Sequence, residues 1–333
     1  MQFRGAVNVN DSLISGNDAE NGGGLSALYS DFTMRDSVVS GNTATSAAGG
    51  VGIADLYGNA ALYVEGSTIS NNSSGQVGGG LYAIGGTISL VQSTISGNTA
   101  AGAFGGAALG AISFATVVNS TISGNTADSA AGLSIFGSAQ ARIAFTTITD
   151  NQAVSNAGGL YVELATPLLL QASIVAGNTA TVNPDLVALD NNGSDVIQSQ
   201  FSLVGTAPSV GTLDNDPESA ALLGEDPLLG PLFDNGGFTL THRPQIGSPV
   251  LDRVPVLTLG CATLVPVDQV GNDRPGLGIC DIGSLEIQRS LAPPLPEATP
   301  VPTLTNWTLA LLGALVGGLG VMASRRRRTV MER

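Results

Sequence analysis

The sequence predicts an all-β protein: a right-handed parallel β-helix (solenoid) with a C-terminal cap, a Pro-rich linker and one C-terminal transmembrane helix. Three observations support this expectation: a short phrase that recurs along the first half, apolar residues that alternate with period two, and a long uncharged stretch near the C-terminus that arginines follow. The expected parts are β-helix repeats over 1–182, a cap over 183–288, a linker over 289–303, a membrane helix over 304–324 and a basic tail over 325–333.

A phrase close to Ser/Thr-x-Ile/Val-Ser-Gly-Asn recurs along the first 180 residues. Equivalent side chains of stacked coils lie one above another, so the closing asparagines can form a ladder of amide hydrogen bonds. Asparagine also tolerates the left-handed backbone of a sharp corner, and the glycine just before it serves the same corner. We therefore expect a structural ladder whose members lie 25 to 30 residues apart: Asn17, Asn42, Asn72, Asn98, Asn125, Asn151 and Asn178.

Apolar residues alternate with polar ones inside each repeat, which is typical of strands and not of helices. The sites five and seven residues before the Ile or Val of the phrase are apolar in every repeat, as Val64 and Leu62 are before Ile69. These sites are out of phase with that Ile or Val, so the chain must turn a corner between two strands. Strands joined by corners and stacked at about 4.8 Å make the coils of a parallel β-helix, about seven here.

The charge and composition exclude some classes of partner. The formal net charge is −14, lysine is absent, and four of the 12 basic residues are clustered near the C-terminus. A strongly acidic body repels nucleic acid, so we expect no nucleic-acid partner. The sequence indicates no cofactor and no metal site.

Catalytic residues are expected to be absent, although the β-helix is also the fold of pectate lyases and other polysaccharide-cleaving enzymes. Those reactions need paired carboxylates or a base beside acidic ligands. Residues 66–127 contain no Asp, Glu, Arg, Lys or His. A sugar-binding aromatic platform is also not expected, because Ala108 and Ser134 interrupt the repeat position that Tyr82 and Tyr161 share.

The region 183–288 loses the repeat and is expected to close the open end of the solenoid. His242, the only histidine, could form a hydrolytic triad with Ser248 and Asp234 or Asp252, but a structural role is favoured. Acidic residues between 214 and 226 could hold calcium, but solvated surface is favoured. Cys261 and Cys280 have no partners at metal-ligand spacing, so a disulfide in an oxidising compartment is expected.

An ordered series of short motifs in this region resembles the C-terminal part of choice-of-anchor Q domain proteins of bacterial surfaces. The resemblance departs at Phe238, where the pattern has proline, and at Arg253-Val254. It implies a β-helix with an anchoring tail and no known reaction. The matching stretches are 201–205 (FSLVG), 226–232 (DPLLGPL), 234–237 (DNGG), 239–242 (TLTH), 247–249 (GSP) with Asp252, 268–269 (DQ), 274–275 (RP) and 280–286 (CDIGSLE).

The C-terminal tail reads as a membrane-spanning signal. Residues 304–323 carry no charge, and a helix of this length spans about 30 Å, which matches a bilayer core. The positive-inside rule places the basic cluster in the cytoplasm and the body outside it. The stop-transfer cluster is Arg325, Arg326, Arg327 and Arg328.

The residues before the span resemble the IPTL-type C-terminal sorting signal, with valine in place of isoleucine. The sorting motif consists of Val301, Pro302, Thr303 and Leu304, with Trp307. This resemblance implies as partner an exosortase-type membrane transpeptidase of Gram-negative bacteria. It also implies that the tail holds the precursor in the inner membrane until cleavage, after which the body reaches the cell surface or the medium.

The first residues show no hydrophobic leader, and we expect the authentic start of an exported precursor to lie upstream. An N-terminally complete protein that inserts through its tail alone is the alternative. The expected function is that of a non-enzymatic cell-surface or secreted protein, adhesin-like or structural, whose glycan or protein ligand the sequence does not identify. The alternatives are a passive envelope component and a polysaccharide lyase or glycoside hydrolase with its catalytic residues outside this sequence.

Overall fold

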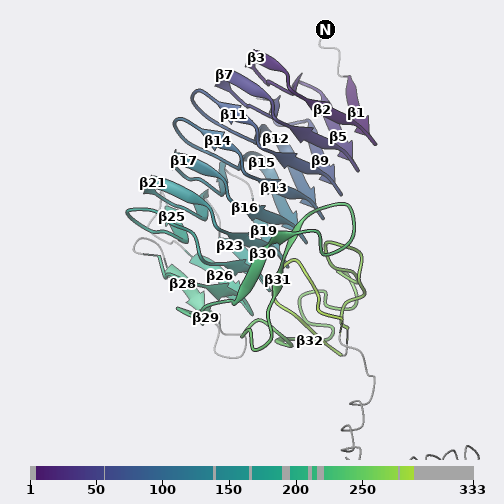
Figure 1. Cartoon of the computed structure of the whole chain (residues 1–333), viewed down its shortest axis with the longest axis vertical. Helices are drawn as coiled ribbons and strands as arrows, with labels where there is room; N and C mark the ends of the chain where they lie inside the picture. Colours follow the sequence, from purple (N-terminus) through teal and green to yellow (C-terminus); the bar gives the residue numbers. More distant parts are fainter. Residues whose placement is uncertain are drawn as a thin grey trace, which may run out of the picture. The chain divides into compact units, whose positions relative to one another are not determined.

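The computed structural model describes residues 5–55, 57–137, 140–164, 167–189, 196–208, 212–215, 221–276 and 278–288. The chain divides into two compact units, Met1–Arg289 and Ser290–Arg333, and all described residues belong to the first. Every regular element among the described residues is a β-strand. Figure 1 shows that these strands stack coil upon coil along the chain.

Three parallel sheets run along this stack, and each collects one strand position from successive coils. The longest path of the 14-stranded sheet is β1 (Ala6–Asn10), β5 (Asp31–Arg35), β9 (Ala61–Glu65), β12 (Leu81–Val91), β15 (Ala107–Val118), β19 (Gln140–Ala144), β23 (Leu168–Gln171), β26 (Val196–Gln200) and β28 (Thr212–Asn215). Its branch, here called the branch face, contains β4 (Leu25–Leu28), β8 (Val51–Ala54), the first parts of β12 and β15, β18 (Leu133–Gly137), β22 (Leu160–Leu164) and β25 (Leu186–Leu189).

The recurring phrase of the sequence forms the second sheet, whose strands contain its central Ile or Val. This nine-stranded sheet, here called the phrase sheet, contains β2 (Leu13–Ser15), β6 (Val38–Ser40), β10 (Thr68–Ser70), β13 (Thr94–Ser96), β16 (Thr121–Ser123), β20 (Thr147–Thr149), β24 (Ile174–Val175), β27 (Leu203–Val204) and β29 (Leu222–Leu223). The third, six-stranded sheet contains β3 (Asp18–Asn21), β7 (Thr43–Ala47), β11 (Ser73–Ser74), β14 (Thr99–Ala100), β17 (Thr126–Ser129) and β21 (Gln152–Asn156).

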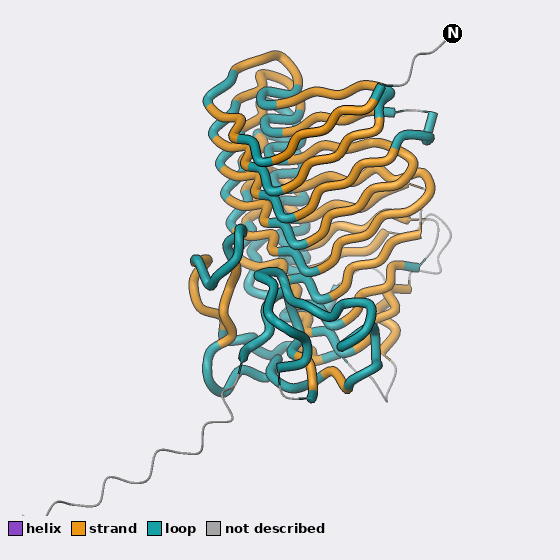
Figure 2. Tube along the Cα trace, turned by 90° about the vertical axis from the view of Figure 1, so that its right-hand side faces the viewer, coloured by secondary structure: helices purple, strands orange, loops and turns teal. Residues whose placement is uncertain are grey.

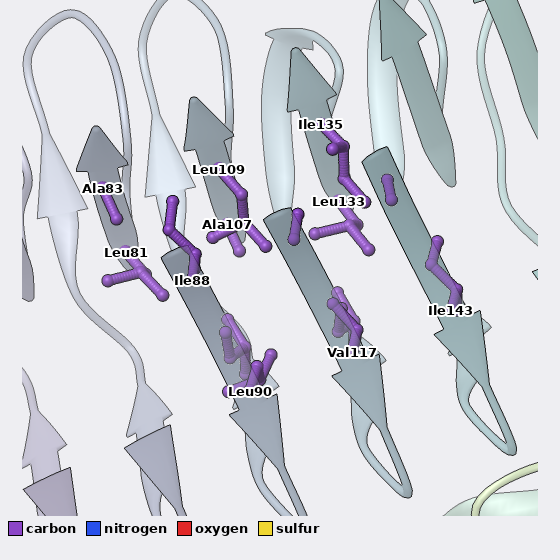
Figure 3. Close-up of a cluster of buried hydrophobic side chains, with 14 of the residues drawn as sticks. Leu81, Ala83, Ile88, Leu90, Ala107, Leu109, Val117, Leu133, Ile135 and Ile143 are labelled. Carbon is purple, nitrogen blue, oxygen red and sulfur yellow. The ribbon is translucent and has the colours of Figure 1, made fainter. Parts of the chain in front are cut away.

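The core is a set of columns of apolar side chains inside the coils. The period-two positions pair in register as expected: Leu90 stacks between Val64 and Val117, and Ile143 follows Val117. Figure 3 shows these side chains directed inward from adjacent coils. Leu90, Val117 and Ile143 are all buried. Full burial of a side chain of this size contributes about 1.5–3 kcal/mol, so the stack is stabilised by contacts between neighbouring coils.

The parallel stacking continues beyond residue 182, where the predicted repeats end. Strand β26 pairs with β23 and β28, and β27 pairs with β24 and β29. Leu186 extends the column of Leu160 on the branch face. The structure therefore differs from the expected start of the cap at residue 183, because strand pairing depends on inward apolar residues and persists here without the sequence phrase.

The rest of the described chain packs on the flank of the solenoid, which differs from the expectation that it closes an open end. It contains two antiparallel pairs, β30 (Leu229–Phe233) with β31 (Thr241–Pro244) and β32 (Val254–Pro255) with β33 (Ile279–Cys280). Figures 1 and 2 show its loops beside the stacked coils. Outward residues of β2 and β6 are exposed or half-buried, whereas those of β13, β16 and β20 are buried. We call residues 229–288 the flank module.

The predicted membrane helix at 304–324 lies outside the described residues. Within the part of the chain that the structure describes, no helix has the length and apolar character needed to span a bilayer.

Candidate functional site

The predicted asparagine ladder is present in the structure. Each ladder asparagine donates its backbone N–H and a side-chain N–H to the Oδ1 atom of the next one. For Asn98, these two bonds reach Asn125 Oδ1 and both measure 3.0 Å. Asn98 Nδ2 also donates to the carbonyl oxygen of Ile69 at 2.9 Å, and Asn98 Oδ1 accepts both bonds from Asn72. Both donors and both acceptor positions of this buried amide are satisfied.

The ladder ends on a carboxylate. Asn178 donates its backbone N–H and its Nδ2 to Asp185 Oδ1 at 3.0 and 2.9 Å. Asp185 is buried and aligns with Gly159 of the preceding coil, so its side chain supplies the acceptor of a further asparagine from a different repeat position. A carboxylate only accepts hydrogen bonds, so it terminates a chain of amides that donate in one direction.

The left-handed corner lies at the residue before each ladder asparagine, one of the two neighbouring positions that the sequence indicates. Residues with positive φ precede the ladder positions, for example Gly97 at 63° and Asn71 at 55°, whereas the ladder asparagines themselves are not among the positive-φ residues. Glycine populates this region without steric cost. The asparagine is therefore required for its amide, and the residue before it supplies the turn.

The flank module is attached to the phrase sheet by a buried glutamine. Gln269 Nε2 donates to Thr94 Oγ1 at 2.9 Å and to Thr239 Oγ1 at 3.0 Å, and its Oε1 accepts from Thr121 Oγ1 at 2.6 Å. Ser284 extends the same contact, because its Oγ lies 2.9 Å from Thr121 Oγ1. The outward threonines of the phrase thus serve as docking points, a role that the sequence phrase alone does not reveal.

His242 also joins the flank module to the phrase sheet. Its Nδ1 lies 2.7 Å from the carbonyl oxygen of Gly230, and its Nε2 lies 2.7 Å from Ser123 Oγ. A carbonyl oxygen only accepts, so Nδ1 carries the proton and Nε2 accepts from the serine hydroxyl. Burial lowers the pKa of His242, while the Gly230 carbonyl and Asp150 act in the opposite direction. The neutral imidazole is thus the form that fits this site.

The structure does not assemble the hydrolytic triad that was considered for this histidine. Ser248 Oγ donates to the Pro227 carbonyl at 2.6 Å, and Asp234 Oδ1 accepts from the Gly236 backbone. The serine that contacts His242 is Ser123, and both side chains are buried. A substrate carbonyl has no access to this pair, which is consistent with a structural role.

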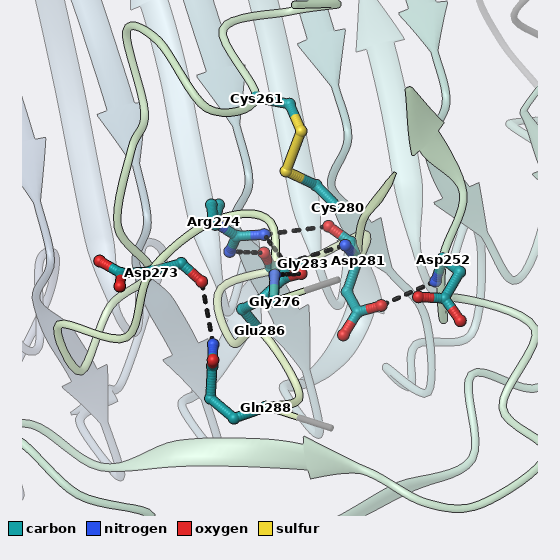
Figure 4. The surroundings of a disulfide bond; sticks show 10 residues. All are labelled: Asp252, Cys261, Asp273, Arg274, Gly276, Cys280, Asp281, Gly283, Glu286 and Gln288. Atoms are coloured by element: carbon teal, nitrogen blue, oxygen red, sulfur yellow. Dashed lines mark hydrogen bonds and ion pairs between the residues drawn. A yellow bond between two sulfur atoms is a disulfide. The ribbon is translucent and has the colours of Figure 1, made fainter. Parts of the chain in front are cut away.

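Cys261 and Cys280 form a disulfide with a Cα–Cα distance of 6.1 Å. Beside it, Arg274 Nη1 lies 3.0 Å from Glu286 Oε2 (Figure 4). The Arg274 guanidinium also lies over the Phe145 ring, with Cζ 4.4 Å from the ring centroid. Burial raises the pKa of Glu286 to about 6, with Arg274 acting in the opposite direction. The disulfide and the ion pair stabilise the interior of the flank module.

An aromatic cluster on the branch face was missed by the sequence reasoning. Tyr82, Phe104 and Phe136 lie on successive coils, with ring centroids 6.4 Å apart for Tyr82 and Phe104 and 5.7 Å apart for Phe104 and Phe136. All three side chains are partly exposed. Ala108 and Ser134 do interrupt the column of Tyr82 and Tyr161 as expected. Phe104 from a corner and Phe136 from a neighbouring column fill the gap. A comparison of single repeat positions therefore could not reveal the cluster.

Tyr161 lies on the same face, two coils beyond Ala108. Tyr161 and Phe104 both pack against the apolar group Ala130, Ala157 and Val187. The Tyr161 hydroxyl donates to Glu163 Oε2 at 2.8 Å. Burial and this carboxylate raise the pKa of Tyr161 to about 12, so the hydroxyl keeps its proton and remains a donor.

No group of three His, Cys, Asp or Glu side chains is close enough to hold a metal ion among the residues that the structure describes. Part of the acidic stretch between 214 and 226 lies outside those residues. The predicted sorting residues also lie outside them: Val301, Pro302, Thr303, Leu304, Trp307, Arg325, Arg326, Arg327 and Arg328.

Two family models match the chain. The model described as right handed beta helix region covers residues 4–201, and the IPTL-CTERM motif covers residues 299–328. No curated protein and no solved structure shows significant similarity to the chain.

The fold and the first of these matches define a parallel β-solenoid. Since that match covers more than half of the 333 residues, the chain belongs to the right-handed β-helix family. The IPTL-CTERM match confirms the predicted C-terminal sorting motif. The sequence and the comparisons together describe a β-helix protein with a C-terminal sorting motif, consistent with an exported surface protein.

Proposed function

We propose that this chain is a non-enzymatic, adhesin-like or structural β-helix protein that is displayed on the cell surface or released after its tail is cleaved. The observation that carries the proposal is the IPTL-CTERM motif at residues 299–328, which follows a β-helix body. The motif, the uncharged stretch and the arginines after it have the order of a sorting signal. The processing partner would be an exosortase-type membrane transpeptidase.

The route begins in the inner membrane. An uncharged helix over 304–324 would hold the precursor there, with Arg325 to Arg328 in the cytoplasm and the body outside. The disulfide Cys261–Cys280 supports this placement, because structural disulfides persist in oxidising compartments. The motif series between residues 201 and 286 further supports membership of the choice-of-anchor Q group of surface proteins.

The absence of catalysis is part of the proposal. Residues 66–127 carry no acidic or basic side chain, and the Ser123–His242 pair is buried against the flank module. General acid–base chemistry needs a titratable group within reach of a bound substrate. The described surface of these central coils offers aromatic and small polar side chains, which suit binding more than bond cleavage.

A variant of the motif tests the route. An internally tagged chain with Pro302→Ala and Thr303→Ala is expressed in a host that has an exosortase, beside a control with Pro293→Ala and Pro294→Ala in the same linker. We expect the motif variant to remain full length in the inner membrane and the control to be processed like the wild type. Equal processing of both variants would overturn the proposed role of the motif.

A further inference from the structure

The aromatic cluster Tyr82, Phe104 and Phe136 is not needed to build a coil. At each equivalent position, other coils carry small or aliphatic residues: Ser134 aligns with Tyr82, Ala130 takes the corner of Phe104, and Leu189 aligns with Phe136 two coils along. Side chains that face outward contribute little to the inner core. The rings are therefore an addition to the repeat, and their partial exposure leaves them accessible.

Phe104 is held in a backbone conformation that disfavours it. Its φ is 68°, at a corner where the neighbouring coils carry Gly78 and Ala130. The same corner also has a positive φ at Ala48, Ala130 and Ala157, so the conformation belongs to the repeat and a small side chain is enough to form it. What Phe104 adds is its ring, which packs against the Ala130 and Ala157 group and remains partly exposed.

The ring of Phe136 lies close over the backbone of the adjacent coil. A Cβ atom built on Gly110 would approach Phe136 Cε2 to 2.8 Å and Cζ to 3.1 Å. Gly110 pairs with Phe136 in register, and its lack of a side chain leaves the space that the ring occupies. Phe104 and Phe136 are stacked with 21° between their planes. The two rings thus overlap in an offset stack, whose uncovered parts continue the aromatic surface toward Tyr82.

The charge around the cluster limits what it can bind. The two outward columns of the branch face run from Ser26 to Val187 and from Leu28 to Leu189, and Glu163 is the one charged side chain among their described residues. With a net charge of −14 for the chain, an anionic glycan, nucleic acid or phospholipid would be repelled. A carboxylate only accepts hydrogen bonds, so it is complementary to a neutral ligand rich in hydroxyl donors.

We propose that Tyr82, Phe104 and Phe136 form a binding platform for a neutral glycan chain, whose sugar rings stack on the aromatic rings while Glu163 accepts hydrogen bonds from its hydroxyls. The rings follow one another along three successive coils, with centroids 6.4 and 5.7 Å apart, so they offer one extended aromatic surface to a chain-like ligand. The flat apolar faces of pyranoses suit aromatic surfaces that carry a few polar groups. The inference rests on the proposed function, because a surface-displayed protein meets such glycans outside the cell.

Isothermal titration calorimetry of the full chain tests this proposal, in a detergent without a sugar headgroup. The probes are cellohexaose, mannohexaose and xylohexaose, with hexagalacturonate as the anionic comparison. Three variants replace each ring by a residue that another coil carries at the equivalent position, which protects the fold: Tyr82→Ser, Phe104→Ala and Phe136→Leu. The matched control is Tyr63→Ala, because Tyr63 is also partly exposed but lies on β9 under the Arg35 guanidinium.

We expect at least one neutral hexasaccharide to bind, the anionic one to bind far more weakly, and each platform variant to lose about tenfold in affinity. The control should keep the wild-type affinity. Lack of binding to all three neutral probes overturns the proposal, as does equal loss in the Tyr63 control. Wild-type self-association that Phe136→Leu abolishes, measured by sedimentation, would assign the surface to a second copy instead. These results do not depend on processing of the tail, so they are distinct from a failure of the proposed sorting route.

Discussion

A central ladder asparagine such as Asn98 uses both donors and both acceptor positions of its buried amide, and this explains why asparagine recurs there. Aspartate lacks the two donors, and it occurs at the last step, where Asp185 accepts from Asn178. Serine or alanine would leave the backbone N–H of the preceding asparagine without its acceptor. The amide thus links each coil to both of its neighbours.

Replacing a central member of this ladder should therefore be costly. We expect Asn98→Ala to lower the free energy of unfolding by about 3 kcal/mol, because buried donors and acceptors lose their partners. Asn17→Ala is the matched control, since Asn17 is exposed and should cost about 1 kcal/mol or less. Urea unfolding followed by circular dichroism measures both values. Equal small losses would mean that the ladder adds little to stability.

His242 should make the free energy of unfolding fall as the pH is lowered, because its pKa is lower in the folded protein. Burial lowers its pKa in the folded protein, so the unfolded chain takes up a proton below about pH 6.5 that the folded site resists. Stability from this group is complete above that pH and is lost as the pH falls toward the folded pKa. We expect His242→Asn, which does not titrate, to reduce the loss of stability between pH 7 and pH 5 by about 1 kcal/mol.

The wild type and the variant must be compared at each pH. Glu286, whose pKa is raised to about 6, titrates in the same range with the opposite sign: its contribution is lost as the pH rises from its unfolded value through 6. This term is common to both proteins and cancels in the difference. If the wild type and His242→Asn lose equal free energy of unfolding between pH 7 and pH 5, His242 is not a buried neutral base.

At this residue scale, the sequence predicted much of the stack and little of the flank contacts. The asparagine ladder and the apolar pair represented by Leu62 and Val64 follow from repetition, because equivalent residues stack in register. The left-handed corner was predicted for the Gly-Asn pair, and the structure assigns it to the residue before the asparagine, because Gly and Asn both tolerate positive φ and only the structure distinguishes them. The Ser123–His242 contact joins residues 119 positions apart, and no local pattern encodes it.

At the scale of elements, the flank module depends on the polar outer surface of the phrase sheet. Thr94, Thr121 and Thr147 lie above one another in register, and each contacts the module through Gln269 or Ser284. A row of hydroxyls on one sheet is a docking surface only if its partner supplies matching groups. The strand β10 carries the same Thr-Ile-Ser as β13 and β16, although its outward residues are only half-buried, whereas β2 and β6 carry Leu13 and Val38 in place of the threonine. The phrase alone therefore does not define where the covered span begins.

This docking can be tested with one glutamine. We expect Gln269→Leu to lower the free energy of unfolding by about 3 kcal/mol, because several buried hydroxyls lose a partner. Limited trypsin digestion should then cut faster after Arg253, the informative site of the module, since Arg243 and Arg274 both precede proline. Gln288→Leu, at an exposed hydrogen bond to Asp273, is the control. Unchanged cleavage would show that the module does not rely on this contact.

At the scale of the whole chain, the body and the tail have separate requirements. The β-helix is stabilised by contacts between coils and gains length by repetition, as the pairing beyond residue 182 shows. The tail carries its information in a short motif and in the contrast between an uncharged stretch and arginines. Both parts were predictable, because each depends on a pattern that is continuous in sequence. The aromatic cluster was not, because Tyr82, Phe104 and Phe136 occupy three different repeat positions.

The most direct test of the central claim is the identity of the C-terminal residue of the body outside the inner membrane. An internally tagged chain is expressed in an exosortase-containing host, the cell fractions and the medium are separated, and each pool is analysed by intact mass and C-terminal peptide mass spectrometry. We expect the surface or medium pool to end near Val301 to Leu304 and to lack the arginine cluster. An intact C-terminus ending at Arg333, found only in the inner membrane, would contradict it.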